Sequence, residues 1–212
     1  MKLSTYLSSM LFAASAITAA PNSPSRQERA AARFNRRSRD RHSNPLQASS
    51  LEDLRIADAN QSHVSYSSNW AGAVLIGSGY KSVTGTITVP TPKKPTGGSS
   101  TTQYAASAWV GIDGDTCSSA ILQTGVDFLI QGSSVSFDAW YEWYPDYAYD
   151  FSNFPVKAGD QIKMTVTATS TGGGSAVLQN LSTGKSVTKT FSGESNKWVI
   201  LQPCPLGKHL HF

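Results

Sequence analysis

Three consecutive segments of this 212-residue chain each place carboxylates, amides or tryptophans on one side. Because successive side chains of a strand point to opposite faces, residues two apart share a face. One face thereby collects Trp109, Gly111, Asp113, Gln123, Gly125, Asp127, Asp138, Trp140, Glu142 and Tyr144. Carboxylates exchange protons and amide N–H groups stabilise oxyanions. We interpret this face as a concave surface that binds an extended polymer, in preference to an ordinary solvated face.

Histidine is absent from the part of the chain that carries these residues. The four histidines are His42, His63, His209 and His211. Residues 64–208 therefore contain no histidine for a Ser-His-Asp site, a Cys-His site or an imidazole-based metal centre. We expect chemistry by carboxylates, amides, hydroxyls or aromatic rings, with no metal and no cofactor.

Polypeptide and polysaccharide both fit such a surface. Asp138 and Glu142 are four residues apart on one expected strand, which separates them by about 13 Å. Glycoside hydrolysis needs carboxyl groups about 5–5.5 Å or about 6.5–9.5 Å apart, so this pair is too far apart, while cross-strand pairs remain open. A carbohydrate-binding module, with exposed Trp109 and Trp140 stacked on sugar rings, is the alternative to a peptidase.

The segments around this face predict an all-β fold. Val, Ile, Thr, Tyr and Trp are frequent in short stretches between Gly-rich turns, and helical periodicity is missing. The expected strands are 73–76, 82–89, 106–112, 120–128, 134–144, 161–169, 175–181 and 186–191. Such a series of short strands predicts a sandwich or a barrel. Residues 91–102 contain no large apolar side chain and predict an exposed loop.

The net charge of +4 belongs to the N-terminal part of the chain. All eight arginines lie between Arg26 and Arg55, whereas residues 64–162 hold four lysines against eight acidic residues. Nucleic-acid binding requires a basic groove with interleaved aromatic side chains. We therefore expect no nucleic-acid partner.

The first 63 residues have the composition of targeting and processing segments. Residues 1–20 combine Lys2, a short apolar stretch and small residues at a cleavage site, which predicts a secretory signal peptide. We expect a secreted, extracellular monomer that does not bind membranes. Residues 21–63 predict a basic propeptide that complements an acidic cleft, although a solvated disordered arm would look the same. The sequons at Asn60 and Asn180 are candidate glycosylation sites.

Four motifs resemble those of the fungal glutamic peptidases, or eqolisins. They are SNWAG at residues 68–72, WVGIDG at 109–114, ILQTG at 121–125 and YEWYP at 141–145. The likeness extends from about residue 67 to about residue 192 with matching order and spacing. It implies an antiparallel β-sandwich, a jelly roll of the concanavalin or lectin kind, and a secreted acid endopeptidase. Its expected partners are a polypeptide substrate and its own propeptide.

In that family a glutamate acts as general base toward water, and a glutamine amide stabilises the oxyanion. By position, the resemblance assigns the catalytic glutamine to Gln123. The residues that match the family's substrate cleft are Trp70, Trp109, Asp113, Asp127, Asp138, Glu142 and Tyr144. Asp127 and Glu142 are weaker candidates for the base.

The chain departs from the family pattern after residue 194. Lys197 stands where the resemblance places the catalytic glutamate, and no acidic residue follows Glu194. We therefore expect residues 64–194 to form the sandwich without its C-terminal strands, residues 195–212 to be a divergent tail, and this chain to be inactive. The tail is either a gene-model artefact or a truncated paralogue. Cys117 matches a disulfide-bonded family cysteine, but Cys204 has an unrelated context, which leaves the partner open.

Overall fold

A computed structural model of the chain describes residues 44–48, 67–77, 79–192 and 208–211. Every element named in these residues is a strand. The described residues include no helix that is long and apolar enough to cross a membrane. The strands are β1 (Gly72–Leu75), β2 (Ser82–Thr88), β3 (Gln103–Asp113), β4 (Ile121–Gln131), β5 (Ser134–Tyr144), β6 (Tyr149–Asp150), β7 (Gln161–Ser170), β8 (Gly173–Asn180), β9 (Lys185–Phe191) and β10 (Lys208–His211).

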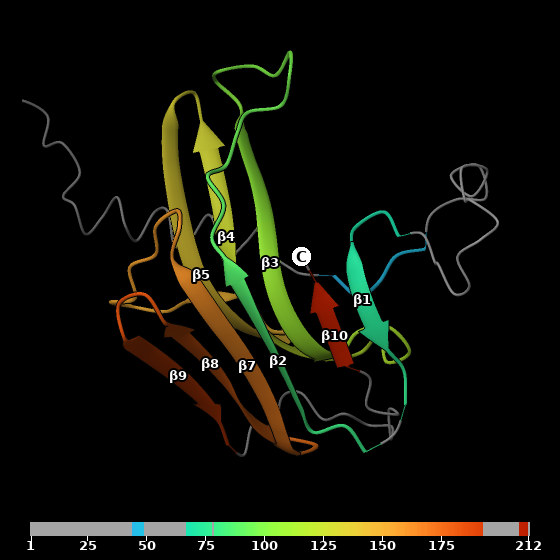
Figure 1. Ribbon diagram of the computed structural model, residues 1–212. Coiled ribbons are helices and arrows are strands. Elements are labelled where there is room, and N and C mark those ends of the chain that lie inside the picture. Colours follow the sequence, from blue (N-terminus) through green and yellow to red (C-terminus); the bar gives the residue numbers. More distant parts are fainter. Residues whose placement is uncertain (1–43, 49–66, 78, 193–207, 212) are drawn as a thin grey trace, which may run out of the picture.

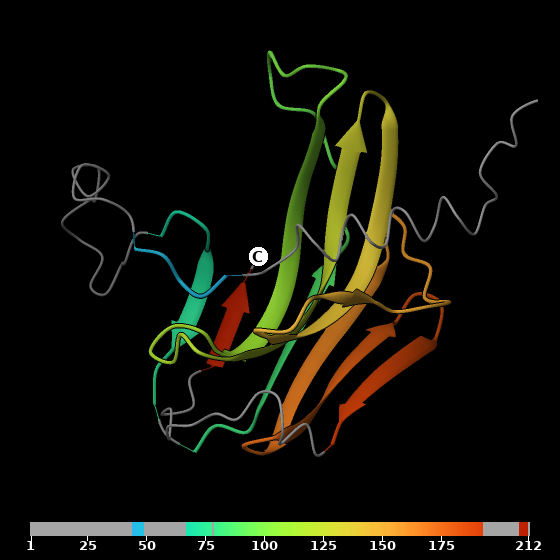
Figure 2. The same cartoon turned by 180° about the vertical axis from the view of Figure 1, so that it is seen from behind.

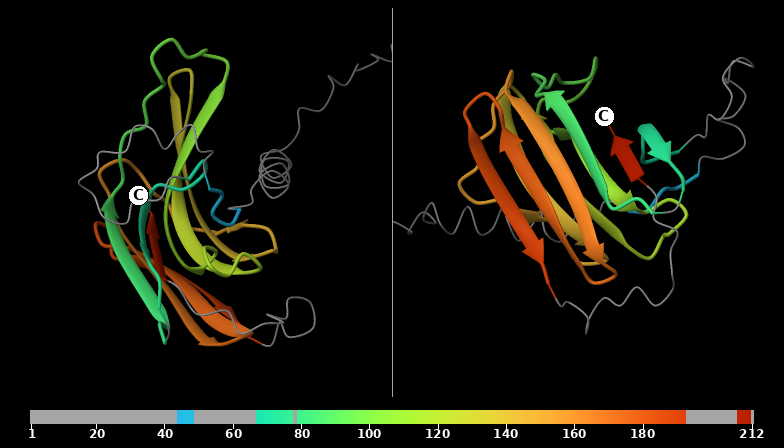
Figure 3. Two further views of the ribbon diagram at one scale, coloured as in Figure 1. Left: turned by 90° about the vertical axis from the view of Figure 1, so that its right-hand side faces the viewer. Right: turned by 60° about the horizontal axis from the view of Figure 1, so that its bottom comes forward.

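The strands form two sheets that pack face to face (Figures 1 and 2). One sheet has the order β1-β10-β3-β4-β5-β6, and the other has the order β2-β7-β8-β9. All paired strands are antiparallel. Figure 3 shows the four-stranded sheet layered against the long strands β3, β4 and β5. The expected antiparallel β-sandwich is therefore confirmed.

The main core lies between the sheets and follows the two-residue period of the strands. On β7, Ile162, Met164 and Val166 are each 0% exposed, whereas the residues between them are only partly buried. Ala176 and Leu178 of β8 are buried in the same cluster. From the other sheet, this core receives the side chains that alternate with Gln123 and Glu142, namely Val110, Ile112, Leu122, Val126, Phe128 and Ala139. The face that carries the candidate chemistry consequently points away from this core.

The long strands that support this face are longer than the sequence indicated. β3 begins at Gln103 and β4 ends at Gln131, three residues beyond each expected boundary. The added end of β3 is mostly exposed, whereas β4 adds the buried Leu129 and the partly buried Ile130 before the exposed Gln131, so neither end shows the apolar–polar alternation that marks a strand in sequence. A tight turn at Gly132, which has a φ of 62°, joins β4 to β5 in the register Gln131↔Ser134. The loop at 91–102 is exposed as expected.

Two short strands were absent from the sequence prediction. β6 is two residues long, and β10 lies within the segment expected to be a divergent tail. β10 inserts between β1 and β3, where Leu210 pairs with Ala73 on one side and with Val110 on the other. The six-stranded sheet therefore contains a strand that the pattern of residues 195–212 did not indicate.

Candidate active site

Register brings the expected site residues into parallel rows across β3, β4 and β5. Gly111 pairs with Gln123, and Gln123 pairs with Glu142. The adjacent row contains Trp109, Gly125 and Trp140, and the next contains Ser107, Asp127 and Asp138. Directly opposed residues of an antiparallel pair project from the same face. The predicted common face is thus confirmed, and it also contains Ser107, which two-residue alternation from Trp109 could have identified.

Gln123 lies at the centre of this face and is fully buried. Its side-chain nitrogen Nε2 donates a hydrogen bond of 3.1 Å to Glu142 Oε2, and both side chains are 0% exposed. Among the residues that the structure describes, none donates a hydrogen bond to Gln123 Oε1, although this oxygen is buried. Buried polar atoms usually have partners, so an unsatisfied amide oxygen marks a place where another group, water or substrate, is expected.

The tryptophans of the face form a second apolar cluster. Trp70 and Trp109 meet edge to face with ring centroids 5.1 Å apart, and Ile121, Trp140 and Ala148 complete the cluster. Trp109 is 6% exposed and Trp140 is 2% exposed. The expectation of exposed tryptophans that stack on sugar rings is therefore wrong, because these rings pack against one another and against neighbouring apolar side chains.

Gly125 allows two of these indoles to approach each other. A Cβ atom at this position would lie 2.6 Å from Ala108 O, 2.6 Å from Trp109 Cβ and 2.8 Å from Trp140 Cζ2. These distances are too short for any side chain. The glycine between Gln123 and Asp127 is therefore required by the packing of the tryptophans.

The two aspartates of the third row have different surroundings. Asp127 is 7% exposed and accepts hydrogen bonds from Ser107 Oγ and, at 2.7 Å, from the indole N–H of Trp140. Asp138 is its direct neighbour on β5. Asp127 therefore fixes the Trp140 ring, which is a more specific role than the cleft position expected from the sequence.

Asp113 and Tyr144 lie at the other end of the face. Asp113 ends β3 with a φ of 70° and is buried, and Tyr144 packs against the tryptophan cluster. Asp113 pairs with Ile121, and Ile121 pairs with Tyr144. All seven residues expected around the cleft thus lie on one side of the sheet, together with Gln123.

A short segment of the expected propeptide contacts the same side of the sheet. Leu46 packs against the tryptophan cluster, and its N–H donates to Gly114 O at 3.0 Å. The indole N–H of Trp70 donates to Asn44 O at 3.1 Å. The side chain of Asn69 donates to Asn44 O and Pro45 O and accepts from the Gln47 N–H. Leu46 was not identified from the sequence, and its apolar character within a polar arm is the only signal for it.

The remaining expected sites are more isolated. Asn180 is 1% exposed, and its amide group donates to Asp160 Oδ2 at 2.8 Å and accepts from the N–H groups of Ser182 and Thr183. Cys117 is disulfide-bonded. The other sequon, at Asn60, and the only other cysteine, Cys204, lie outside the described residues.

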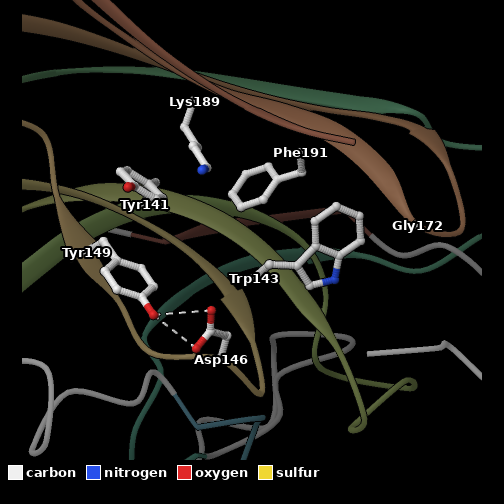
Figure 4. A pocket seen from close by; sticks show the side chains of 7 residues that line it. All are labelled: Tyr141, Trp143, Asp146, Tyr149, Gly172, Lys189 and Phe191. Atoms are coloured by element: carbon white, nitrogen blue, oxygen red, sulfur yellow. Dashed lines mark hydrogen bonds between the residues drawn. The ribbon is translucent and has the colours of Figure 1, made fainter. Parts of the chain in front are cut away.

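A separate aromatic cavity lies on the opposite face of β5 (Figure 4). It has a volume of about 240 Å³ and is lined by Tyr141, Trp143, Asp146, Tyr149, Gly172, Lys189 and Phe191. Tyr149 donates to both oxygens of Asp146, and Lys189 Nζ lies 5.6 Å from the Tyr141 ring centre. Burial raises the pKa of Tyr141, and the charges of Asp146 and Asp150 raise it further. Its residues from β5, Tyr141 and Trp143, alternate with Glu142, so the cavity lies on the other face of the sheet from Gln123.

In the described part of the chain, no three His, Cys, Asp or Glu side chains lie close enough together to hold a metal ion. The groups that the site offers are an amide, several carboxylates and tryptophan rings. An amide held by a buried carboxylate can donate to a developing negative charge. Carboxylates near it can order substrate or water.

Comparisons with known proteins point to one family. A family model described as the Peptidase A4 family matches residues 68–202. Aspergillopepsin-2 of Aspergillus niger is 51% identical over 224 aligned residues, which cover 94% of this chain and 77% of that protein. Scytalidopepsin B of Scytalidium lignicola is 49% identical over 149 residues, which cover 70% of this chain and 54% of that protein.

One solved structure adds a similarity in three dimensions. Scytalido-glutamic peptidase, crystallised with a transition state analog inhibitor, matches with a TM-score of 0.55 and 47% sequence identity. The match covers 66% of this chain and 61% of that one. The present chain therefore spans less than two thirds of this structure and of scytalidopepsin B.

Proposed function

Because this chain belongs to the peptidase A4 family, we propose that it is a secreted acid endopeptidase of the glutamic type, in which Gln123 stabilises the oxyanion. One observation carries the proposal. The Gln123 carboxamide is fully buried at the centre of β4 and is held by Glu142 before any substrate arrives. A donor that is fixed in advance stabilises developing charge without the cost of reorganisation.

The reaction divides the work between two groups. A general base takes a proton from water, the water oxygen attacks the scissile carbonyl carbon, and the carbonyl oxygen gains the negative charge. When this tetrahedral intermediate collapses, the C–N bond breaks and the base returns the proton to the leaving amine nitrogen. An N–H of Gln123 donates to that oxygen. Removal of one such donor typically lowers kcat by about 10²–10³-fold. The peptide approaches along the side of the sheet that carries Trp70, Trp109 and Tyr144.

Neither of the two weaker candidates is assigned as the general base in this proposal. Glu142 is fully buried against Gln123, and Asp127 is held by Ser107 and Trp140. Each of these carboxylates therefore already accepts a hydrogen bond from a neighbouring side chain. We therefore propose that residues 1–212 bind polypeptide without hydrolysing it. Turnover needs the family's catalytic glutamate, and the resemblance places Lys197 at that position in this chain.

A chimera tests this division. The segment after residue 192 is replaced by the corresponding C-terminal part of aspergillopepsin-2, and cleavage of a denatured protein is measured at acidic pH. We expect the chimera to cleave, Gln123→Ala to reduce its kcat by about 10²–10³-fold, and Gln131→Ala to have no effect. Gln131 is a matched control because it is exposed at the far end of the same strand. Full activity of the Gln123→Ala chimera would refute the assignment.

The unmodified chain is assayed beside the chimera. We expect the unmodified chain, immobilised on a solid surface, to bind a denatured protein at acidic pH and to release no peptides from it. Turnover by the unmodified chain would contradict the proposal that hydrolysis needs the missing glutamate.

We further propose that residues 21–63 are a propeptide whose segment 44–48 blocks the cleft. The support is the set of contacts from Asn44, Leu46 and Gln47 to Trp70, Gly114 and Asn69. Backbone hydrogen bonds together with one apolar side chain are the contacts that an extended peptide substrate would make. A substrate that needs the same groups must displace the segment.

A binding assay measures how strongly the segment 44–48 competes with a denatured protein for the cleft. Leu46→Asp places a charge against the tryptophan cluster, and we expect it to raise the affinity of the chain for a denatured protein. Leu181→Asp is the matched control, because Leu181 is 51% exposed in the turn that follows β8 of the other sheet. Equal affinities in the two variants would contradict the proposed block.

We also propose that the protein is exported and processed. The support is the composition of residues 1–20, with its short apolar stretch and small-residue cleavage site. Expression in a secreting fungal host followed by N-terminal sequencing of the protein in the medium tests this. Retention of Met1 on a cell-associated product would refute the signal peptide.

A further inference from the structure

We infer that Glu142 is a positioning residue for Gln123: it determines which end of the Gln123 carboxamide is available to the substrate. The inference rests on the proposed function of Gln123, but it assigns Glu142 a role distinct from both substrate contact and general base. It starts from the adjacent positions of the two residues on neighbouring strands, where Gln123 and Glu142 are direct partners in the register of β4 and β5.

The hydrogen bond between the two side chains has a fixed direction. Gln123 Nε2 donates to Glu142 Oε2 at 3.1 Å. An ionised carboxylate only accepts hydrogen bonds, whereas a carboxamide has a donor end and an acceptor end. The nitrogen end of Gln123 must therefore face Glu142. One N–H of Nε2 is used in this bond, and the second N–H remains as the donor for an oxyanion.

The surroundings hold the pair in this arrangement. A Cβ atom on Gly111 would lie 3.2 Å from Gln123 Cβ, so the side of Gln123 toward β3 is closely packed. On the other side, Thr124 Oγ1 donates to Trp140 O at 2.6 Å and ties β4 to β5 beside the pair. With both side chains 0% exposed, rotation of the amide would leave Oε1 against a buried carboxylate. Placing two acceptors face to face in a buried site is strongly unfavourable.

The hydrogen bond to Gln123 also distinguishes this role from direct catalysis. Gln123 and Glu142 are both 0% exposed, and Glu142 Oε2 is already occupied by the N–H of Gln123 Nε2. A buried carboxylate is costly unless its hydrogen bonds compensate for the loss of water. The free-energy cost of burying Glu142 is explained if the orientation of Gln123 matters for function.

The experiment measures the preference of the full chain for a tetrahedral transition-state analogue over a matched plain peptide. The probe is a peptide that carries a phosphinate in place of the scissile amide, and its Kd is compared with that of the parent peptide. Any competition from residues 44–48 affects both ligands equally and cancels in the ratio. We expect Gln123→Ala to lower this preference by about 100-fold.

Glu142→Gln tests the inference itself. The new carboxamide has almost the same shape but can donate as well as accept, so it no longer selects one end of Gln123. We expect the preference to fall by about tenfold, in line with the loss of a hydrogen bond to a charged group, and Glu142→Asp to retain part of it. The control is Asp160→Asn, which removes a buried carboxylate from the far sheet and should leave the ratio unchanged.

The outcomes distinguish the inference from the proposed function. If the wild-type chain shows no preference, or if Gln123→Ala keeps it, the function proposed for Gln123 fails. If Gln123→Ala loses the preference while Glu142→Gln keeps it, Gln123 acts without help from Glu142 and the inference is overturned.

A second measurement on the wild-type chain covers the case in which Glu142→Gln does not fold. The side-chain ¹⁵N–¹H signals of Gln123 are followed by NMR as a function of pH, together with the carboxyl ¹³C signals of Glu142, Asp113, Asp127 and Asp138. Protonated Glu142 no longer demands a donor, so the Gln123 signals should shift with the midpoint of Glu142. A Gln123 signal that follows one of the three aspartates, or that does not change while Glu142 titrates, would refute the inference.

Discussion

Replacement of Gly125 by alanine would test whether the rows of side chains across β3, β4 and β5 are as tightly packed as the structure indicates. The added methyl group would lie 2.6 Å from the carbonyl oxygen of Ala108 and 2.6 Å from Trp109 Cβ. The first is a backbone atom of the paired strand and cannot move without disturbing the β3–β4 pairing. The third contact, at 2.8 Å to Trp140 Cζ2, would push a buried ring that is fixed by Asp127.

The expected loss of stability follows from these contacts. Overpacking of a well-filled site costs about 1–3 kcal/mol. Because one of the clashing atoms belongs to the backbone, the larger end of that range applies, and we expect the free energy of unfolding to fall by about 3 kcal/mol. Gly172→Ala is the matched control, because its Cβ would meet no atom within 4 Å and the position has no positive φ. A reduction in the entropy of the unfolded chain would make Gly172→Ala neutral or stabilising by up to about 1 kcal/mol.

Urea unfolding followed by tryptophan fluorescence measures both variants. We expect a lower midpoint for Gly125→Ala at an unchanged slope, together with a red shift of the native emission as Trp109 and Trp140 move apart. Equal midpoints for Gly125→Ala and Gly172→Ala would refute the packing argument, since only the methyl group at position 125 would meet atoms closer than 3.0 Å.

Two further predictions concern the rest of the sandwich. Asn180→Ala should lower the free energy of unfolding by about 2–3 kcal/mol, because it removes the side-chain donor to the buried Asp160 and, among the described residues, leaves that carboxylate with only the Lys157 N–H. Mass spectrometry of the wild-type protein should find no glycan on Asn180, whose amide is already occupied. The chain should lose stability at alkaline pH, because the pKa of Tyr141 is raised in the folded state. This contribution is complete below about pH 10, the pKa of an exposed tyrosine, and is lost as pH rises through the higher folded pKa. In unfolding measured against pH, Tyr141→Phe should show a smaller alkaline loss than the wild type, and an identical loss would contradict the assignment.

Much of the candidate site could be predicted from residue types and two-residue alternation. Alternation placed Gln123 and Glu142 on the face opposite Leu122 and Trp143, and the register confirms both assignments. The reason is physical: one side of each long strand faces the core between the sheets, so apolar residues at every second position reveal the other side.

Contacts between distant segments could not be predicted in the same way. Alternation predicts on which face of the sheet a side chain lies, but it does not predict how exposed that side chain is. Trp140 was expected to be exposed because its neighbours on that face are polar. The ring is buried because Ala148 and Leu46, which lie outside the long strands, pack against the same cluster. The pairing of Gln123 with Glu142 likewise depends on the register set by the turn at Gly132, which neither residue reveals by itself.

The position of β10 has a consequence for the time course of folding. β1 enters the six-stranded sheet only through β10, with Ala73 paired to Leu210. A nascent chain that has already formed the β3–β4–β5 meander must therefore wait for residues 208–211 to leave the ribosome before β1 can join the sheet. Contacts between such distant segments form late and slow folding. Because Trp70 lies two residues before β1, we expect it to reach Trp109 late, so that the tryptophan cluster beside Gln123 is completed after the rest of the sandwich.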